Sequence, residues 1–409
     1  MAESESTAIP EANSTQRSDR EQFTIGSLKT LLEELSIPVC FNQITGEVDI
    51  ENLPLNVSGT SRREALITFI QSDYRYRYTG CTRDTIDSYL NIIADENRYN
   101  PVLIHIQREI WDGKNRIEDL YKILNLPESD TLSRTLLKKW LIQAVCLLQN
   151  ENDEPKYKTE GIIVLCGKQG IGKSRFLGKL AMLSEWFGDG LKLRAYDKDT
   201  ERRAITKFIT ELGEIETTFS GTDPADLKGF ISRSVDRYRL PYGRNDIVSA
   251  RRTSFCGSCN SVDYLVDQTG NRRFWTIPVE RVDHAALDEL NVLQLWAEVY
   301  AKSQDKGAVY YLTDEEREQL EKRNGTHVVQ LPSEAEVRDI LAEAKEHPER
   351  WKESTVTNFK ACYPILNKYS SVQVGKALSK LGIECSRNNS GRTRRLPILS
   401  PCAVTEHNP

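Results

Sequence analysis

The stretch Gly161–Leu180 reads GIIVLCGKQGIGKSRFLGKL, and it decides the fold of the chain. It begins with Ile162–Cys166, a run of apolar and β-branched residues typical of a buried parallel strand. Gly170 and Gly172 then permit a tight turn that a Cβ atom would obstruct, and a helical pattern of apolar residues follows Ser174. The sequence therefore predicts a strand, a glycine-rich loop and a helix, which is the setting that the G-x-x-x-x-G-K-S motif requires.

The glycine-rich loop has the composition of a phosphate-binding site for ATP. Backbone N–H groups and the helix N-terminus would hold the phosphates, Lys173 would reach the β- and γ-phosphates, and the Ser174 hydroxyl would complete a Mg²⁺ site. The residues expected to contact the nucleotide are Gly167, Lys168, Gln169, Gly170, Ile171, Gly172, Lys173, Ser174 and Arg175. A chance glycine-rich turn is the alternative, and the strand and helix patterns on either side of the motif argue against it.

Composition sets the broad class. The chain has 409 residues, of which 39% are hydrophobic and 28% charged, so two or three globular domains are expected. The net charge of −5 does not by itself indicate a nucleic-acid binder. No apolar run reaches the ~18 residues that a membrane span needs, and the polar N-terminus does not resemble a secretory signal. We expect a cytoplasmic protein without a membrane partner.

Cysteine usage supports the same compartment. The nine cysteines are scattered singly, several of them in apolar runs, and this pattern predicts reduced, buried thiols. The C-x-x-C pair at Cys256 and Cys259 has no second pair or nearby histidine, so we expect no metal site there.

Patterns along the chain predict five segments. These are a disordered tail (1–22), a mostly helical N-terminal domain (23–125), an α/β core with a parallel sheet (126–285), a helical segment (286–350) and a C-terminal module (351–409). Within the N-terminal domain, Tyr74–Tyr78 reads YRYRY. Its aromatic rings and arginines would suit single-stranded nucleic acid, or they would form an ordinary amphipathic surface.

Two acids and an amide follow the glycine-rich loop at strand ends. Ala204–Gly213 contains a second apolar strand that ends at Glu211, with Glu214 close behind. Magnesium and the attacking water must be held at such a position, although a capping or solvated glutamate would give the same pattern. A third apolar strand, Thr253–Cys259, delivers Asn260 at its end.

Arginines are concentrated in two stretches. Six arginines lie between Arg233 and Arg252, where they would bind either a neighbouring subunit's ATP phosphates or a nucleic-acid backbone. Arg272 and Arg273 stand on a turn before the strand Phe274–Val279. An arginine at such a turn could stabilise the negative charge that develops on a γ-phosphate. For either residue taken alone, an ordinary surface arginine in an ion pair is the default interpretation.

The C-terminal module combines a helix with a hairpin. Ser371–Gly382 has a helical pattern, and Ile383–Leu399 alternates around an Asn-Asn-Ser-Gly turn, so the module resembles a winged helix. The basic residues that would contact DNA are Lys376 and Lys380 on the helix and Arg387, Arg392, Arg394 and Arg395 on the wing. A purely packing role for the module is equally compatible with the pattern.

Together, these motifs resemble the virulence-associated protein E family, whose ATPase core is similar to superfamily III helicases of the AAA+ class. The matching stretches lie between residues 98 and 300 and include Gly167–Ser174, Phe208–Glu214, Arg239–Arg244, Arg251–Asn260 and Thr269–Trp275. The resemblance implies a P-loop AAA+ core in which Lys173 and Ser174 are Walker A residues and Asn260 is sensor 1. Glu211 and Glu214 stand in the Walker B region, but their spacing departs from the usual adjacent acids. Which of them binds magnesium and which activates water therefore stays open.

The resemblance also implies an assembly and a substrate. Arg272 or Arg273 would be an arginine finger acting on a neighbouring subunit, which implies a homo-oligomer, in this class a ring. Arg239, Tyr242 and Arg244 match the hairpin that superfamily III helicases point at DNA. The expected function is an ATP- and Mg²⁺-dependent DNA helicase in replication of a phage or mobile element. The alternative is an ATP-switched nucleic-acid-binding regulator or defence factor that does not unwind DNA processively.

Overall fold

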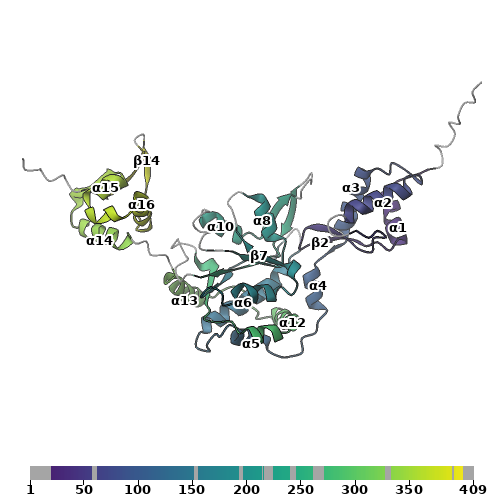
Figure 1. Ribbon diagram of the computed structural model, residues 1–409, viewed down its shortest axis with the longest axis horizontal. Helices are drawn as coiled ribbons and strands as arrows, with labels where there is room; N and C mark the ends of the chain where they lie inside the picture. The colour runs from purple at the N-terminus through teal and green to yellow at the C-terminus, as the bar shows by residue number, and fades with distance from the viewer. Residues whose placement is uncertain are drawn as a thin grey trace, which may run out of the picture.

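The computed structural model describes residues 20–57, 62–151, 155–192, 197–213, 215, 224–239, 246–260, 271–327, 333–388 and 391–398. Their buried apolar side chains form an N-terminal core, a C-terminal core and two clusters on the two faces of one sheet. The corresponding lobes are purple, yellow-green and teal in Figure 1. The expected tail lies mostly outside the described residues, except that Glu21–Gln22 forms a short strand, β1.

The N-terminal lobe is a small α/β unit. Its elements are α1 (Ile25–Glu34), β2 (Val39–Asn42), β3 (Glu47–Ile50), α2 (Arg62–Tyr74), β4 (Tyr78–Thr79), α3 (Arg83–Glu96) and β5 (Arg98–Tyr99). The alternation around Thr45 and Gly46 produces the antiparallel β2–β3 pair as expected, and β5 and β1 add parallel pairs with β2 and β4. Thr24 caps the N-terminus of helix α1, and its hydroxyl accepts a hydrogen bond from the Ser27 amide.

A five-stranded parallel sheet forms the centre of the molecule, as the apolar runs predict. Its order is β12-β6-β11-β8-β7. The strands are β6 (Ile162–Cys166), β7 (Phe187–Leu191), β8 (Ile209–Leu212), β11 (Ser254–Cys259) and β12 (Phe274–Pro278). All five residues of β6 are buried, because helices cover both faces of the sheet.

Alternation along the strands divides the central core into two layers. Ile163 and Leu165 pack on one face, where the cluster includes residues of α4 (Pro101–Gln107), α5 (Arg116–Ile123), α6 (Thr131–Leu148), α7 (Lys173–Leu180), α11 (His284–Glu289), α12 (Val292–Ser303) and α13 (Asp314–Gly325). Ile162 and Val164 pack on the other face with α8 (Lys198–Ile205) and α10 (Pro224–Ile231). Beside α8 lies the antiparallel hairpin β9 (Val235–Arg239) and β10 (Asp246–Ala250).

The lobes divide the chain differently from the expected boundary at residue 125. Helices α4 and α5 belong to the central core, because Val102, Ile106 and Leu120 pack with the apolar side chains of α6 and α12. Helix α6 is buried along almost its whole length and is tied to the sheet through polar groups. The Trp140 indole donates to the Phe255 carbonyl at 2.9 Å, and the Gln143 amide donates to the Gly161 carbonyl at 2.9 Å.

One pair of cysteines differs from the expectation of reduced thiols. Cys166 and Cys259 are register partners on the adjacent strands β6 and β11, with their Cα atoms 4.9 Å apart, and they form a disulfide. The parallel register brings together two side chains separated by 93 positions in the sequence. Cys256, the other half of the C-x-x-C pair, is a free buried thiol.

The C-terminal lobe has its own core. Helices α14 (Glu334–Ala344), α15 (Val356–Cys362) and α16 (Ser371–Lys380) pack with the antiparallel sheet β13-β15-β14, formed by Trp351–Ser354, Gly391–Pro397 and Ser386–Asn388 respectively. Short 3₁₀ helices occupy Ser184–Trp186, Asn271–Arg273, Pro348–Arg350 and Pro364–Lys368. Helix α14 falls within the expected helical segment 286–350, but Val337 and Leu341 pack in this C-terminal core.

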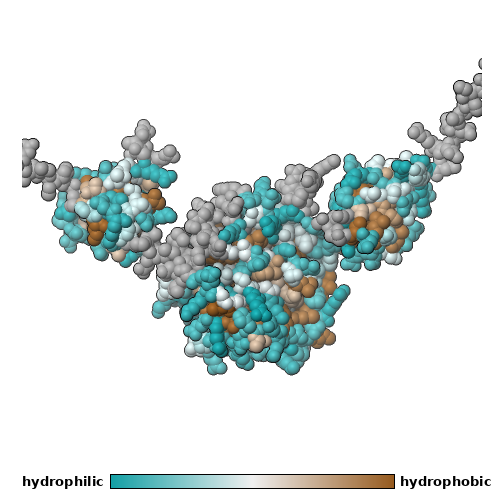
Figure 2. All heavy atoms as spheres, viewed as in Figure 1, coloured by the Kyte–Doolittle hydropathy of each residue, from teal (hydrophilic) through white to brown (hydrophobic). Residues whose placement is uncertain are grey.

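Hydrophilic side chains cover most of the described surface seen in Figure 2, with small apolar areas between them. Within the part of the chain that the structure describes, no helix has both the length and the apolar character to cross a membrane.

Candidate nucleotide-binding site

The glycine-rich loop connects β6 to α7 at the carboxyl edge of the sheet. Gly170 and Gly172 have φ values of 83° and 97°, which L-residues with a side chain rarely adopt. A Cβ atom on Gly172 would lie 2.2 Å from Cε1 of His284, and one on Gly167 would lie 2.0 Å from the Val279 carbonyl oxygen. Both the conformation and the close packing of this loop therefore require glycine.

Lys173 begins helix α7 and is 6% exposed. Its ammonium group donates to the carbonyl oxygens of Gly167 and Lys168 at 2.7 and 2.8 Å and to Oδ1 of Asn260 at 3.1 Å. These contacts hold a positive charge directly beneath the turn of the loop. Asn260 follows β11, so the lysine also connects the loop to a second strand end.

A buried carboxylate lies beside the loop. Oε1 of Glu211, on β8, accepts hydrogen bonds from the hydroxyl groups of Ser174 at 2.8 Å and Ser258 at 2.7 Å. Glu211 is 1% exposed, and its Oε2 atom has no hydrogen-bond partner among the described residues. Burial raises the pKa of Glu211 and the charge of Asp189 adds to this effect, while the two hydroxyl groups and Lys173 oppose it.

These residues fit the chemistry of a magnesium ion. Mg²⁺ prefers oxygen ligands and is commonly held by one or two carboxylates, a hydroxyl group and nucleotide phosphates. The unpartnered Oε2 atom of Glu211 and the exposed Ser174 hydroxyl supply such oxygens side by side. Glu214, the second expected acid, lies outside the described residues.

The topology explains why these side chains meet. Strand β11 lies between β6 and β8, and all three are parallel, so their carboxyl ends share one edge of the sheet. The structure thus brings together Lys173, Ser174, Glu211 and Asn260, all named from the sequence. Ser258 was missed, although the period of two along β11 places it on the same face as Asn260.

Other loop residues have varied environments. Lys168, Gln169 and Gly170 are exposed and Ile171 is partly buried, so the loop surface is open. Arg175 is also exposed, but its guanidinium pairs with the Asp288 carboxylate of α11 at 2.7 Å. Helix α11 therefore packs against the loop through both this ion pair and the His284 ring.

Arg272 and Arg273 lie at the opposite edge of the same sheet. They precede β12, whose first residue is paired with Ile162 and whose last is paired with Cys166, next to the loop. Because β12 has five residues, its ends are about 13 Å apart, farther than an arginine side chain reaches. Arg273 is partly buried and its Nε donates to the Ser232 hydroxyl at 2.5 Å, while Arg272 is exposed and forms no ion pair with the described residues.

Several of the arginines between residues 233 and 252 serve the fold, contrary to the expectation that they contact a phosphate or nucleic acid. Arg251 is 1% exposed and forms a bidentate ion pair with Asp236 at 2.5 Å. Arg252 is also buried, donates to the Asn150 carbonyl at 2.7 Å, and has its pKa lowered by burial to about 10. Arg233 pairs with Glu201.

The expected DNA-contacting residues are only partly visible. Tyr242 and Arg244 lie outside the described residues, as do the side chains of Arg239, Lys380 and Arg387. Lys376, Arg392 and Arg395 are exposed. Arg394 differs from the expectation, because it is 9% exposed and its guanidinium donates to the Ser379 hydroxyl at 2.6 Å within the lobe.

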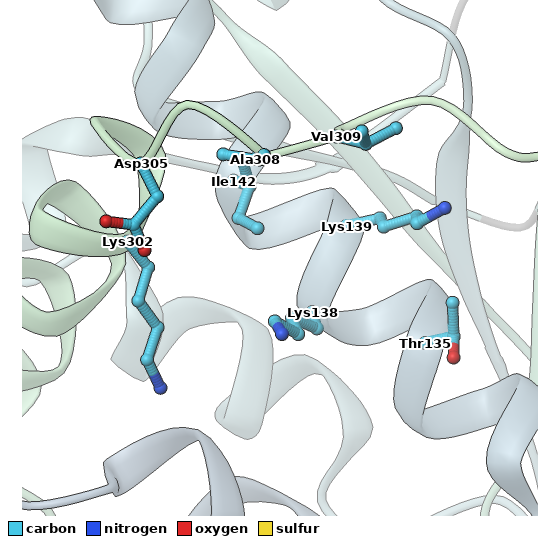
Figure 3. A pocket seen from close by; sticks show the side chains of 9 residues that line it. Thr135, Lys138, Lys139, Ile142, Lys302, Asp305, Ala308 and Val309 are labelled. Carbon is cyan, nitrogen blue, oxygen red and sulfur yellow. The ribbon is translucent and has the colours of Figure 1, made fainter.

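A separate hollow of about 460 Å³ lies between α6 and the segment after α12. Figure 3 shows Lys138 and Lys139 on α6, with Lys302 and Asp305 across from them. Lys139 is already paired with Glu316, and Lys302 with Glu298. Two of the three lysines that line this hollow are therefore already used in ion pairs within the fold.

The sheet, its helical layers and the strand-end residues define a mixed α/β protein with a candidate nucleotide site. Residues 106–329 match the virulence-associated protein E-like domain, and the chain belongs to this family. No curated protein matches the chain.

The chain also matches two solved structures, both at TM-scores below 0.5. The apo structure of the C-terminal region of NrS-1 (residues 305–718) is 14% identical, with a TM-score of 0.44 over 91% of this chain and 98% of that chain. The X-ray structure of the JCV helicase is 10% identical, with a TM-score of 0.27 over 68% of this chain and 81% of that chain.

Proposed function

We propose that the chain is a Mg²⁺-dependent, ATP-hydrolysing motor of the AAA+ class, similar to superfamily III DNA helicases, that acts in replication of a phage or mobile element. The observation that carries this proposal is the meeting of Lys173, Ser174, Glu211 and Asn260 at one edge of the parallel sheet. Family membership supports the same conclusion, because the family's core is expected to be an ATPase.

Each side chain of the site would have a distinct role. The loop amides and Lys173 would bind the ATP phosphates, which would take the place of the carbonyl contacts that the lysine now makes. Ser174 and Glu211 would hold Mg²⁺, which neutralises charge on the phosphate oxygens during transfer. Asn260 would orient the attacking water from its position beside Lys173.

The arginine finger in this proposal is Arg272 from a neighbouring subunit. The glycine-rich loop of the same subunit lies at the opposite edge of the sheet, so the Arg272 side chain would reach only another protomer's ATP. Of the two candidates, Arg272 has the exposed guanidinium, whereas Arg273 is bonded to Ser232. This geometry supports a homo-oligomeric ring, in which every interface pairs one surface with a different one.

The DNA would be gripped by the turn between β9 and β10 and by the C-terminal lobe. The turn carries Tyr242 and Arg244 in sequence, and the lobe presents Arg392 and Arg395 on strand β15 of a winged-helix-like module. Three helices and a small antiparallel sheet support that module type.

One experiment tests the whole proposal. ATP hydrolysis by the purified chain is measured with and without single-stranded DNA, with the mass of the assembly determined under the same conditions and unwinding of a forked duplex followed in parallel. We expect an oligomer whose ATPase is stimulated by single-stranded DNA and which separates the fork. Hydrolysis and tight DNA binding without unwinding would instead identify an ATP-switched regulator, and absence of hydrolysis in the assembled state would refute the motor.

A further inference from the structure

The Tyr74–Tyr78 segment of the N-terminal lobe separates into buried and exposed aromatic residues. Tyr78 is 6% exposed, and its ring centroid lies 5.3 Å from that of Phe23. Tyr74 packs against Phe69 at 5.9 Å. Tyr76, between them, is 61% exposed. The two outer rings therefore belong to the core, while the middle ring is presented to solvent.

Three exposed arginines, Arg20, Arg75 and Arg77, lie near Tyr76 in sequence or in the fold. The Arg75 guanidinium lies 4.6 Å from the Tyr76 ring centroid and donates to its hydroxyl group. Arg77 follows Tyr76 in sequence, and its guanidinium lies over the neighbouring Tyr78 ring, 5.5 Å from the centroid. Arg20 faces Arg77, because β1 and β4 are parallel with Glu21 paired to Tyr78. We name these four residues, Arg20, Arg75, Tyr76 and Arg77, the Arg-Tyr patch.

The charges of the Arg-Tyr patch differ from those of three other arginines of the lobe. Arg63, Arg83 and Arg98 each pair with a carboxylate, that of Asp87, Glu64 and Asp95 respectively. The three patch arginines form no ion pair with any described residue, although Glu21 and Asp73 are close in sequence. The pKa of Tyr76 is lowered by the Arg75 hydrogen bond, then by the charge of Arg75, with a smaller effect from Arg20. Positive charge is thus concentrated at one exposed ring.

We propose that the Arg-Tyr patch binds single-stranded nucleic acid, with a base stacked on Tyr76 and phosphates contacted by the arginines. An exposed aromatic ring between unpaired guanidinium groups combines the two contacts that single strands offer, an unstacked base and a charged backbone. A duplex has no free base to stack, and an acidic peptide needs no exposed ring. The patch lies outside the nucleotide site, and its binding does not require ATP hydrolysis.

Photochemical crosslinking of the full chain tests this proposal directly. An oligonucleotide containing 5-iodouracil is bound in the absence of ATP, irradiated and mapped by mass spectrometry, and we expect a crosslink at Tyr76. In titrations with fluorescent oligothymidylate, Tyr76→Ala should weaken binding by at least about fivefold, whereas Tyr76→Phe should bind as the parent does because the ring is kept. The double variant Arg75→Ala/Arg77→Ala should lower the slope of log K against log salt by about 1.4, for two phosphate contacts.

Two controls match these variants. Arg83→Ala removes a paired arginine from the same lobe, and Tyr311→Ala removes an exposed tyrosine from the central lobe, so neither should change binding. If Tyr76→Ala lost the same affinity for duplex DNA as for single-stranded DNA, the stacking contact would be refuted. If the Tyr76→Ala and arginine variants bound single-stranded DNA as tightly as the parent, the site itself would be refuted. ATP hydrolysis without DNA is measured separately and should be the same in Tyr76→Ala. If the parent chain hydrolyses no ATP but the crosslink forms, the proposed motor fails while this inference holds.

Discussion

Lys173 is the residue whose removal most directly tests the nucleotide site. Its ammonium group contacts the loop carbonyls and Asn260 at the edge of the sheet, so alanine at this position removes a charge rather than an apolar core side chain. Lys173→Ala should reduce ATP turnover by at least about 100-fold while the far-UV circular dichroism spectrum stays that of the parent. Lys122→Ala, an exposed lysine of α5, is the matched control and should hydrolyse ATP normally. Undiminished turnover by Lys173→Ala would place the ATPase site elsewhere.

Variants of Glu211 and Ser258 distinguish a metal ligand from a residue that positions that ligand. Glu211→Gln removes the charge needed for Mg²⁺ and should lower turnover by at least about 100-fold. Ser258→Ala removes one of the two hydroxyl groups on Oε1 and should cost about tenfold, because Ser174 still holds that oxygen.

A magnesium titration distinguishes the two effects. Added Mg²⁺ should restore much of the activity of Ser258→Ala, and it should not restore Glu211→Gln. Glu318→Gln, on the exposed face of α13, should behave as the parent chain. If excess Mg²⁺ rescued both variants alike, Glu211 would not be the carboxylate that holds the metal.

At the scale of elements, the β9–β10 hairpin depends on one buried ion pair. The side chains of Arg251 and Asp236 are 0% and 5% exposed, and Arg251 also lies between the rings of Phe230 and Phe255 at 4.9 and 4.8 Å. Asp236→Ala leaves that guanidinium buried without its partner and should lower the free energy of unfolding by about 3–5 kcal/mol, measured by urea denaturation.

An exposed pair in the N-terminal lobe provides the comparison. Glu64→Ala removes the partner of Arg83, where both side chains are about half exposed, and should cost less than about 1 kcal/mol. A loss of similar size in the two variants would contradict the assignment of Arg251 to the fold.

The parallel sheet and the positions of the residues that form the candidate nucleotide site were the most predictable features. The four strands β6, β8, β11 and β12 are apolar runs, and parallel strands deliver their last residues to one edge, so Glu211 and Asn260 could be placed beside the loop from sequence alone. Strand β7 escaped prediction because Phe187–Leu191 contains two glycines and an aspartate. It pairs with β8 at the edge of the sheet, where polar residues are tolerated.

Long-range pairing accounts for the remaining differences. No local pattern distinguishes Arg251 from an exposed arginine, because its partner Asp236 lies on the neighbouring strand of the hairpin. The Cys166–Cys259 pair likewise depends on strand register. Helices α4 and α5 are amphipathic in sequence whichever core receives them, so their place in the central lobe follows from packing against α6, α11 and α12.

For the whole molecule, the N-terminal and central lobes meet close to the proposed DNA hairpin. Gly46, in the β2–β3 turn, lies against the Tyr238 hydroxyl of β9, and Glu47 pairs with Arg202 of α8 at 2.9 Å. Burial raises the pKa of Tyr238 to about 12, so this tyrosine is uncharged in the contact at neutral pH. The Arg-Tyr patch is therefore carried by a lobe that touches the hairpin's own strand.

Assembly through Arg272 leads to a prediction that only an oligomer can satisfy. Lys173→Ala has a defective loop and an intact arginine, and Arg272→Ala has the reverse, so each should be inactive alone, with Arg272→Ala reduced about 10³-fold or more. Mixed in equal amounts, they should regain up to about one quarter of the parent ATPase, because that share of head-to-tail interfaces combines an intact loop with an intact arginine. Arg273→Ala should keep most of its turnover, since its guanidinium is bonded to Ser232 within the subunit. A mixture that stays inactive while forming assemblies of the parent's mass would refute hydrolysis at a shared interface.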